Sequence, residues 1–341
     1  MATLSDLFVG QKHEALRKTI FVVLLGQLIS FLMAVTSFCS SYLAKLGVDA
    51  PVTQSFFTYL CLTAVYGSIK LFRPKKMMIP WYYYAPLGFV DVQGNYFFTK
   101  AFQYTSITSV TLFDCGTIPW VIVLTYFFLG TRYSIRQYFG VATCILGLAL
   151  VLVSDAGIGG GGGSKPLFGD FLVIIATLFY ALSNVGEEYC VKQKDLVEVI
   201  SMLAVFGLVF SICEIALLER QVFESIEWSY SVILGFAGYA AGGFLFYTLV
   251  PLLLQLSGAT MFNLSALTSD MWAVLIRILF YHEEVGWLYY VSFAIVALGL
   301  VIYSISEKNC TAMTCPDEHF SSQYQILAVE CAESGPDTLV A

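Results

Sequence analysis

The chain has 341 residues, of which 58% are hydrophobic and 12% are charged, with a mean hydropathy of +0.78 and a formal net charge of −7. Soluble domains carry about 25% charged residues, so this composition excludes an ordinary soluble domain and indicates a protein dissolved in lipid. The acidic residues scatter over loops, tail and apolar segments, and the net charge therefore says little about partners.

Ten apolar runs follow one another along the chain, each close to the roughly 20 residues that cross a hydrocarbon core as a helix. They cover 19–43, 52–72, 82–103, 106–128, 136–154, 169–191, 196–218, 230–252, 259–280 and 287–306. The first run is too long for a cleavable signal peptide and lacks a small-residue cleavage site. We therefore expect it to stay in the protein as an uncleaved anchor.

The basic residues are distributed asymmetrically between the segments that connect these runs. With a cytosolic N-terminus, twelve Lys and Arg residues lie on the cytosolic side, and only Lys45, Lys165 and Arg220 lie on the other side. Cytosolic segments of membrane proteins carry the excess of Lys and Arg. The pattern predicts an even number of spans with both termini in the cytosol.

The sequence contains an internal repeat. Residues 108–151 and 260–303 match without a gap at an offset of 152, which pairs Trp120 with Trp272 and Gly147 with Gly299. The first span also resembles the sixth, more faintly. Five spans per repeat place the two copies upside down relative to each other, as in transporters whose site lies between the halves. We predict an all-α integral membrane protein of ten transmembrane helices, arranged as two inverted five-helix repeats.

The expected segments follow from this repeat. They are a cytosolic N-terminal segment (1–18), the first repeat (19–154), a Gly-rich luminal or extracellular linker (155–168), the second repeat (169–306) and a cytosolic tail (307–341) that we expect to be disordered. The five consecutive glycines of the linker lack the order of a phosphate-binding loop and indicate a flexible tether. Palmitoylation of Cys310 or Cys315 stays open beside plain free thiols.

Polar residues inside the spans are the candidates for function, because a charge at mid-bilayer costs at least about 2.5–3.5 kcal/mol and must face protein or water. In the third span, a helical projection places Asp91 with Asn95 on one face and Tyr96 with Lys100 on the other. The candidate substrate-binding residues are Asn95, Tyr96, Lys100, Gln103, Tyr104, Asn184 and Asn263. The alternative for Asp91 and Lys100 is that they only neutralise neighbours within the helix packing.

Five in-span acids are candidates for proton or ion coupling, or for charge balance. They are Asp91, Asp114, Glu187, Glu188 and Asp270. Pro119 follows Asp114, and a mid-helix proline frees a carbonyl one turn back, which predicts a broken helix beside a buried carboxylate. A simple kink with Asp114 paired to Lys100 is the equal alternative. Lys192 and Lys194 could neutralise the adjacent glutamates.

Four stretches carry a family resemblance: Asp91–Tyr96, Lys100–Ser106, Ser109–Asp114 and Ser183–Tyr189. They resemble the F subfamily of solute carrier family 35, within the drug/metabolite transporter superfamily, over roughly residues 15–306. The resemblance implies ten helices, cytosolic termini and solute transport. Gln93 departs from the pattern, because an acidic residue is expected there, and this departure puts a proton role at that position in doubt.

The charged residues within the spans limit the class of substrate that we expect. Family 35 is best known for nucleotide-sugar exchangers of the Golgi, whose substrates bring about two negative charges and call for clustered Lys or Arg. Here the five in-span acids stand against two basic residues, Lys100 and Arg277. We predict a secondary-active or facilitative transporter of a small neutral or cationic metabolite, nucleobase- or nucleoside-like, working by alternating access. A Golgi nucleotide-sugar antiporter is the alternative, since Lys100 could serve one phosphate, and a non-transporting receptor or scaffold is another.

Enzyme activity is not expected. The G-x-G-D motif of an intramembrane aspartyl protease is missing, and all three histidines lie outside the spans, which leaves no metal site. We expect no cofactor and no nucleic-acid partner. The expected partners are a small-molecule solute and the lipid bilayer, with a homodimer left open, as is the choice between an endomembrane (Golgi or vesicle) and the plasma membrane.

Overall fold

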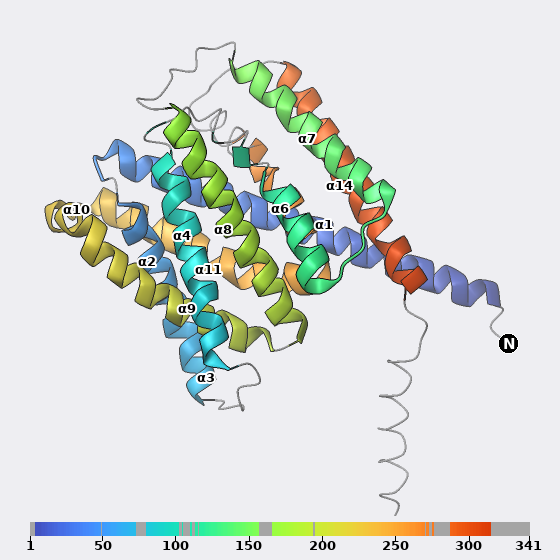
Figure 1. Cartoon of the computed structure of the whole chain (residues 1–341), viewed down its shortest axis with the longest axis horizontal. Helices are drawn as coiled ribbons and strands as arrows, with labels where there is room; N and C mark the ends of the chain where they lie inside the picture. The colour runs from blue at the N-terminus through green and yellow to red at the C-terminus, as the bar shows by residue number, and fades with distance from the viewer. Residues whose placement is uncertain are drawn as a thin grey trace, which may run out of the picture.

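The structure, a computed structural model, is a bundle of helices (Figure 1). It describes residues 4–48, 50–72, 80–101, 104, 110, 113–114, 116–156, 166–193, 195–269, 271–272, 275 and 287–314. Every regular element within these ranges is helical. The helices that build the bundle are α1 (Leu4–Lys45), α2 (Pro51–Leu62), α3 (Ser68–Phe72), α4 (Tyr84–Ala101), α6 (Thr117–Leu124), α7 (Ile135–Ala156), α8 (Pro166–Gln193), α9 (Leu196–Glu214), α10 (Arg220–Ser225), α11 (Tyr230–Leu256), α12 (Ala259–Ala266) and α14 (Trp287–Thr314).

Five helical segments of the described chain are long and apolar enough to cross a membrane. They are Leu16–Lys45, Pro51–Phe72, Leu167–Lys192, Leu196–Ser225 and Tyr230–Leu256. Two shorter apolar helices span Thr117–Leu129 and Tyr290–Ser306. The expected spans 106–128 and 259–280 lie partly outside the described residues, so the count of ten spans stays a prediction.

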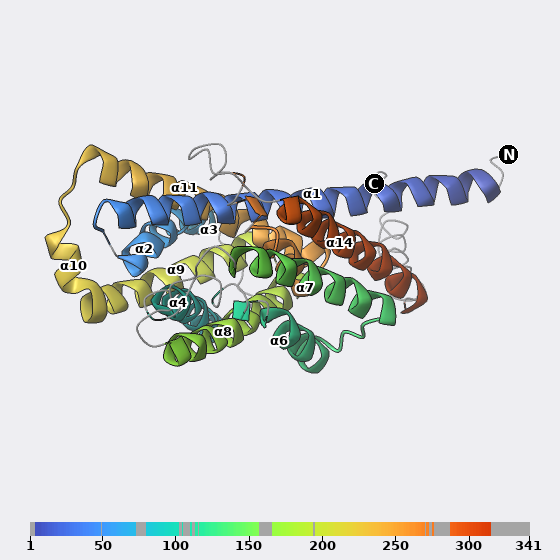
Figure 2. The same ribbon diagram turned by 90° about the horizontal axis from the view of Figure 1, so that it is seen from above.

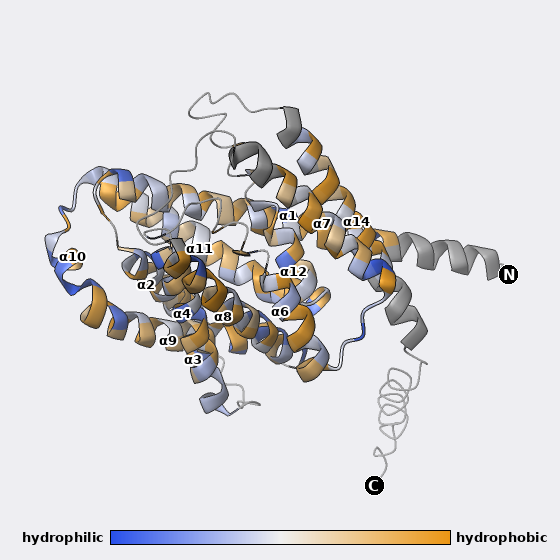
Figure 3. Cartoon of the chain, turned by 45° about the horizontal axis from the view of Figure 1, so that its top comes forward, coloured by the Kyte–Doolittle hydropathy of each residue, from blue (hydrophilic) through white to orange (hydrophobic). Residues whose placement is uncertain are grey.

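The outer surface of the bundle is apolar. Leu71, Phe72, Phe127 and Leu217 each expose between 74% and 83% of their surface. Figure 3 shows hydrophobic residues along most of the bundle helices. Contiguous exposed apolar surface of this extent is unfavourable in water, whereas the hydrocarbon core of a bilayer accommodates it.

The helices pack in pairs that are distant in sequence. α1 lies along α11, α4 along α8, and α7 along α14, and the last pair runs side by side in both ribbon views (Figures 1 and 2). α2 contacts α9 and α11, while α6 contacts α8 and α12. These contacts place α1, α4, α6, α8, α11 and α12 around the centre of the bundle.

Small residues allow α7 and α14 to approach closely. A Cβ atom at Gly299 would lie 2.8 Å from the backbone nitrogen of Cys144 and 2.9 Å from the carbonyl oxygen of Gly140. The Cys144 thiol donates to the carbonyl of Val296 at 3.5 Å. Membrane helices use small residues in this way to bring their backbones together.

Two helices continue through a π-helical turn. The turn Thr63–Gly67 links α2 to α3, and the turn Ile215–Glu219 links α9 to α10. A π-helical turn contains one residue more per turn than an α-helix, so it changes which side chains share a face, and such turns are frequent at functional sites.

The expected proline break differs from the structure. Pro119 is the third residue of α6, which begins at Thr117 after a turn at Gly116. A proline in the first turn of a helix removes no intrahelical hydrogen bond, because that N–H has no partner in any helix. Pro119 therefore helps to begin α6, and its interpretation as a mid-helix residue was wrong. The helix break expected beside Asp114 is present, as the turn at Gly116.

Candidate functional site

A cavity of about 150 Å³ lies at the centre of the bundle. Six helices and the segment just before α6 line it. The lining residues are Met33, Asp91, Asn95, Phe98, Asp114, Thr117, Ile118, Tyr180, Asn184, Glu187, Phe246, Tyr247, Val250, Phe262, Asn263, Ala266 and Leu267. Five of the candidate site residues from the sequence therefore meet here together with Asp91, although their positions span most of the chain.

Asp91 is the centre of a hydroxyl network. Tyr59 and Tyr247 donate to its Oδ2 atom at 2.5 and 2.9 Å, and Ser183 donates to Oδ1 at 3.1 Å. The three donors come from α2, α11 and α8, so one carboxylate of α4 joins four helices. A buried polar group is costly unless it is hydrogen-bonded, and this network meets that requirement. Hydroxyl groups, and not Lys100, satisfy Asp91.

Asparagine side chains form two separate groups of hydrogen bonds in the lining of the cavity. Asn95 donates to the Tyr247 hydroxyl at 3.3 Å and accepts from the Tyr180 hydroxyl at 3.1 Å. Asn184 donates to the Asn263 side-chain oxygen at 3.1 Å, and Asn263 donates to the carbonyl of Ala259 at 2.7 Å. Asn95, Asn184 and Asn263 thus present amide groups on α4, α8 and α12.

Two further carboxylates line the cavity. Glu187 is 3% exposed, and its Oε1 atom has no hydrogen-bond partner among the described residues. Thr117 donates to Oδ1 of Asp114 at 3.4 Å. An unpaired oxygen on a buried carboxylate is a ready acceptor for a donor or a cation that enters the cavity.

The cavity is acidic and aromatic. Asp91, Asp114 and Glu187 line it, and its described lining contains no Lys, Arg or His. Phe98, Phe246 and Phe262 add flat apolar surface. Such a lining attracts a cation or a polar neutral molecule and disfavours an anion.

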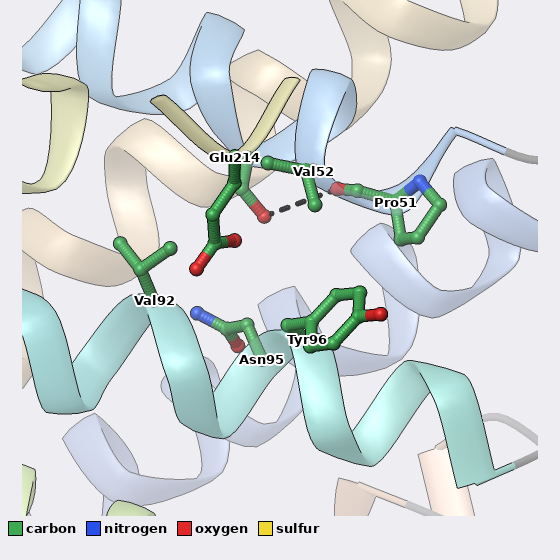
Figure 4. A pocket seen from close by; sticks show the side chains of 7 residues that line it. Pro51, Val52, Val92, Asn95, Tyr96 and Glu214 are labelled. Atoms are coloured by element: carbon green, nitrogen blue, oxygen red, sulfur yellow. Dashed lines mark hydrogen bonds between the residues drawn. The ribbon is translucent and has the colours of Figure 1, made fainter. Parts of the chain in front are cut away.

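The other candidate residues lie elsewhere. Lys100, in the last turn of α4, is not among the lining residues, and Tyr104 packs edge-on against Phe168 with ring centroids 5.1 Å apart. Tyr96 lines a separate small pocket (Figure 4). Gln103 and Asp270 lie outside the described residues, as do Lys194 and Arg277.

Glu188 lies outside the cavity lining and holds the start of α12. Its Oε2 atom accepts from the backbone N–H of Ala259 at 2.7 Å, and Lys192 pairs with Oε1 one turn further along α8. A carboxylate at a helix N-terminus satisfies an otherwise unpaired N–H and the helix dipole. The expected neutralisation by Lys192 therefore applies to Glu188.

Several residues around the site were missing from the sequence-based candidates. Tyr59, Ser183 and Tyr247 complete the Asp91 network. Ser183 begins the family motif Ser183–Tyr189, which was a signal for it, whereas nothing in the local sequence distinguishes Tyr59 and Tyr247 from other span residues. Glu214 is different, because it lies within the expected span 196–218 and a full count of in-span acids includes it. Its side chain is buried and accepts a hydrogen bond from Gln93.

Comparisons with known proteins agree with this architecture. The sequence profile of Solute carrier family 35 (SLC35F) matches residues 15–305. Solute carrier family 35 member F2 of Mus musculus is 32% identical over 310 residues, covering 86% of this chain and 83% of the mouse protein. A solute carrier family 35 member of Schizosaccharomyces pombe is 34% identical over 291 residues, covering 83% of this chain and 57% of the yeast protein.

A solved crystal structure shares the fold. It superposes with a TM-score of 0.67 at 16% sequence identity, over 83% of this chain and 98% of that chain. The family match, together with several apolar helices long enough to cross a membrane, defines the class of a multi-pass membrane transporter for solutes. The chain belongs to solute carrier family 35, in its F subfamily, which confirms the resemblance of the sequence motifs. Its relatives are transporters, consistent with a protein that is not an enzyme.

Proposed function

We propose that this carrier moves a small cationic or neutral metabolite with a flat ring, such as a nucleobase-like compound. The observation that carries the proposal is Glu187, which lines a cavity without any described basic residue and whose buried Oε1 atom has no hydrogen-bond partner among the described residues. A protonated or amino-bearing ring would supply the missing donor, in a charge-assisted hydrogen bond.

The remaining lining supports the same class of ligand. Phenylalanine rings provide faces for stacking and for cation–π contact. Asn184 and Asn263 offer both donors and acceptors, which suit the edge of a heterocycle. A nucleotide sugar would bring its two negative charges against Asp91, Asp114 and Glu187. The Golgi nucleotide-sugar alternative is therefore less favoured by the charge of the cavity.

The inverted-repeat arrangement, which we propose for the mechanism, has support in the helix geometry. Two of the three described π-helical turns begin at Thr63 and Ile215, at the same offset of 152 as the repeated sequence, and the third begins at Thr125. If a two-fold axis relates the halves, equivalent residues on the axis contact each other. Two contacts have this property: Asn95 with Tyr247, and Cys144 with Val296, each pair 152 residues apart.

A two-fold axis also requires that each close contact away from the axis has an equivalent contact between the two repeat-related residues. Gly140 lies against Gly299, and their equivalents under the same offset are Ser292 and Gly147. Gly147 lies against Ser292, since a Cβ atom there would be 3.1 Å from its carbonyl oxygen. Both pairs join α7 to α14, and they support a pseudo-two-fold between the repeats.

Hydrogen bonds at the start of α12 join it to α8 and to the segment around Tyr133, next to the part of α12 that lines the cavity. Glu188 holds Ala259, and the Tyr133 hydroxyl lies 2.7 Å from that of Thr260 and 2.6 Å from that of Thr125. With a cytosolic N-terminus these contacts are expected on the cytosolic side of the cavity. Alternating access would break these contacts as the halves rock against each other.

The proposal is tested by counterflow in vesicles that contain the purified full-length protein. The panel comprises nucleobases, nucleosides, nucleotide sugars and methylphenylpyridinium, a flat aromatic cation. We expect uptake of neutral or cationic compounds and none of the nucleotide sugars. Glu187→Gln should lower uptake of an amino-bearing nucleobase about tenfold, because a hydrogen bond to a charged group contributes roughly 1.5–3 kcal/mol.

Glu224→Gln is the matched control, because Glu224 is an exposed partner of Arg220. This variant should transport like the wild type. Robust counterflow of a nucleotide sugar would show that the cavity charge was misjudged. Saturable binding without flux would instead identify a receptor.

A further inference from the structure

A second, much smaller pocket lies beside the central cavity, between α2, α4 and α9. Ser55, Asn95, Tyr96 and Glu214 provide its polar lining, and Figure 4 shows Glu214 and Asn95 facing each other across it. Its volume of about 10 Å³ corresponds to roughly one water molecule. The pocket is therefore too small for a metabolite.

Glu214 is the unusual member of this pocket. It is 7% exposed, its Oε1 atom accepts from Gln93, and its Oε2 atom has no hydrogen-bond partner among the described residues. An ionised carboxylate that is buried with one oxygen unpaired is costly. A proton on Oε2 removes the charge and turns that oxygen into a donor toward the pocket.

The π-helical turn after Glu214 explains why Glu214 and Glu219 both point toward neighbouring helices. Residues five apart on an α-helix point about 140° apart, whereas a π-helical turn brings them toward one face. Glu219, at the end of the turn, accepts from the backbone N–H groups of Val52 and Thr53 at 2.8 and 2.9 Å. One turn therefore lets α9 hold α2 through Glu219 and α4 through Glu214.

The pocket is joined to the central cavity by a shared residue. Asn95 lines both, and its amide also contacts Tyr180 and Tyr247 of the cavity. We propose that Glu214 binds and releases a proton in this pocket, and that Asn95 links its protonation to the substrate cavity. This inference rests on the proposed transport function and gives the carrier a coupling residue on α9.

The surroundings favour a proton over a metal ion. A metal ion needs several oxygen ligands, but Gln93 already donates an N–H to Glu214 and the pocket holds about one water molecule. The titratable groups near Glu214 are Tyr96 on α4, which lines the pocket, Glu219 at the end of the π-helical turn, and Tyr239 on α11, which hydrogen-bonds Ser55 of the lining. Tyr59 on α2 packs against Gly207 of α9 and donates to Asp91, outside the pocket lining. The described chain places no Lys or Arg in ion-pair contact with Glu214.

The chemical step is a simple exchange. An O–H bond forms on Oε2 of Glu214 as a proton arrives from water, and the bond breaks when the proton returns to water on the other side. Protonation weakens the charge-assisted bond from Gln93, because the acceptor loses its charge. The hydrogen bond that attaches α9 to α4 therefore depends on whether Glu214 is protonated. In the proposed exchange, one proton leaves the vesicle for each cation that enters.

The first experiment reads the proton site without any substrate. Infrared difference spectra of the reconstituted protein are recorded across a pH jump, and we expect a carboxyl C=O band that is absent in Glu214→Gln. The band should persist in Glu224→Gln and shift its midpoint in Glu214→Asp. A band that is unchanged in Glu214→Gln would overturn the assignment.

The second experiment reads coupling. With vesicles more acidic inside, wild-type protein should accumulate methylphenylpyridinium about tenfold per pH unit, the limit for one-to-one exchange. Glu214→Gln should lose this accumulation but keep counterflow at equal pH, while Glu224→Gln keeps both. The coupling role would be overturned if Glu214→Gln still accumulated methylphenylpyridinium along the pH gradient. It would also be overturned if the wild type showed counterflow but no accumulation driven by the gradient. Absence of wild-type counterflow for the whole panel would refute the transport proposal, while the infrared band still decides the proton site.

Should Glu214→Gln fail to fold, Glu214→Asp serves in its place. Aspartate keeps the carboxyl group but shortens its reach toward Asn95. We expect it to retain accumulation with a displaced pH dependence, and a pH dependence identical to that of the wild type would count against the proposal.

Discussion

At the scale of single residues, Asp91 and Lys100 have separate environments. Asp91 is satisfied by the hydroxyls of Tyr59, Ser183 and Tyr247, and Lys100 is absent from the lining of the central cavity. The sequence suggested Lys100 as a substrate-binding residue and Asp91 as a residue for coupling or charge balance, with neutralisation of neighbours in the helix packing as the alternative for both. Asp91 is thus a buried acid that joins helices, whereas Lys100 is a basic residue near the end of a helix.

This geometry leads to a prediction about Lys100 that opposes the one suggested by charge alone. We expect Lys100→Ala to retain counterflow within about twofold of the wild type, since neutral changes outside a site usually cost less than about 0.5 kcal/mol. Asp91→Ala is the contrasting variant. It leaves three hydroxyls without their acceptor, which costs about 1–3 kcal/mol each when they stay unpaired, and should lose transport. Loss of uptake in Lys100→Ala would place that side chain on the substrate path.

At the scale of elements, the α7–α14 pair depends on glycine. The backbones approach so closely that side chains larger than hydrogen at Gly299 meet the backbone of α7, which cannot rotate away as a side chain does. Close-packed interiors transmit such strain. This interface is therefore the least tolerant of added volume.

We predict that Gly299→Val lowers the melting temperature of the purified protein in detergent, because overpacking costs about 1–3 kcal/mol. Gly67→Val is the matched control in a helical segment, since the nearest atom to a Cβ there is the Cγ2 of Thr63 at an ordinary 3.7 Å. A thermal-shift measurement compares the two variants. Equal melting temperatures would mean that α7 and α14 can separate at little cost.

At the scale of the whole molecule, the placement of positive charge sets the orientation. Both termini are expected on the cytosolic side, as is the last part of α14, which follows the expected tenth span. Twelve of the basic residues are expected on the same side. With this orientation, the contacts of Glu188 and Tyr133 with the start of α12 are expected on the cytosolic side of the cavity.

The orientation predicts that the sequon Asn309-Cys310-Thr311 carries no glycan when the protein is made in eukaryotic cells. A glycosylation cassette inserted into the linker 155–168 provides the control and should be modified. Both are read as mobility shifts that glycosidase reverses. A glycan on Asn309 would reverse the assigned orientation.

The sequence by itself determined the class, the family and part of the cavity. Composition and span length are properties of the chain alone, and the motifs around Asp91–Tyr96 and Ser183–Tyr189 led to the family that the comparisons show. Asn95, Asn184 and Glu187 were found because polar groups inside apolar spans must face protein or water, whatever the packing.

Only the tertiary structure decided which side chains meet. Helical periodicity gives the face of a residue on its own helix, but not the rotation of that helix against its neighbours. The partners of Asp91 come from three other helices, and Glu188 turns toward α12 while the adjacent Glu187 borders the cavity. The position of Glu219 relative to Glu214 depends further on a π-helical turn that shifts the periodicity directly after α9. Contacts between distant helices, and local departures from the regular helix, are what periodicity along one segment leaves undetermined.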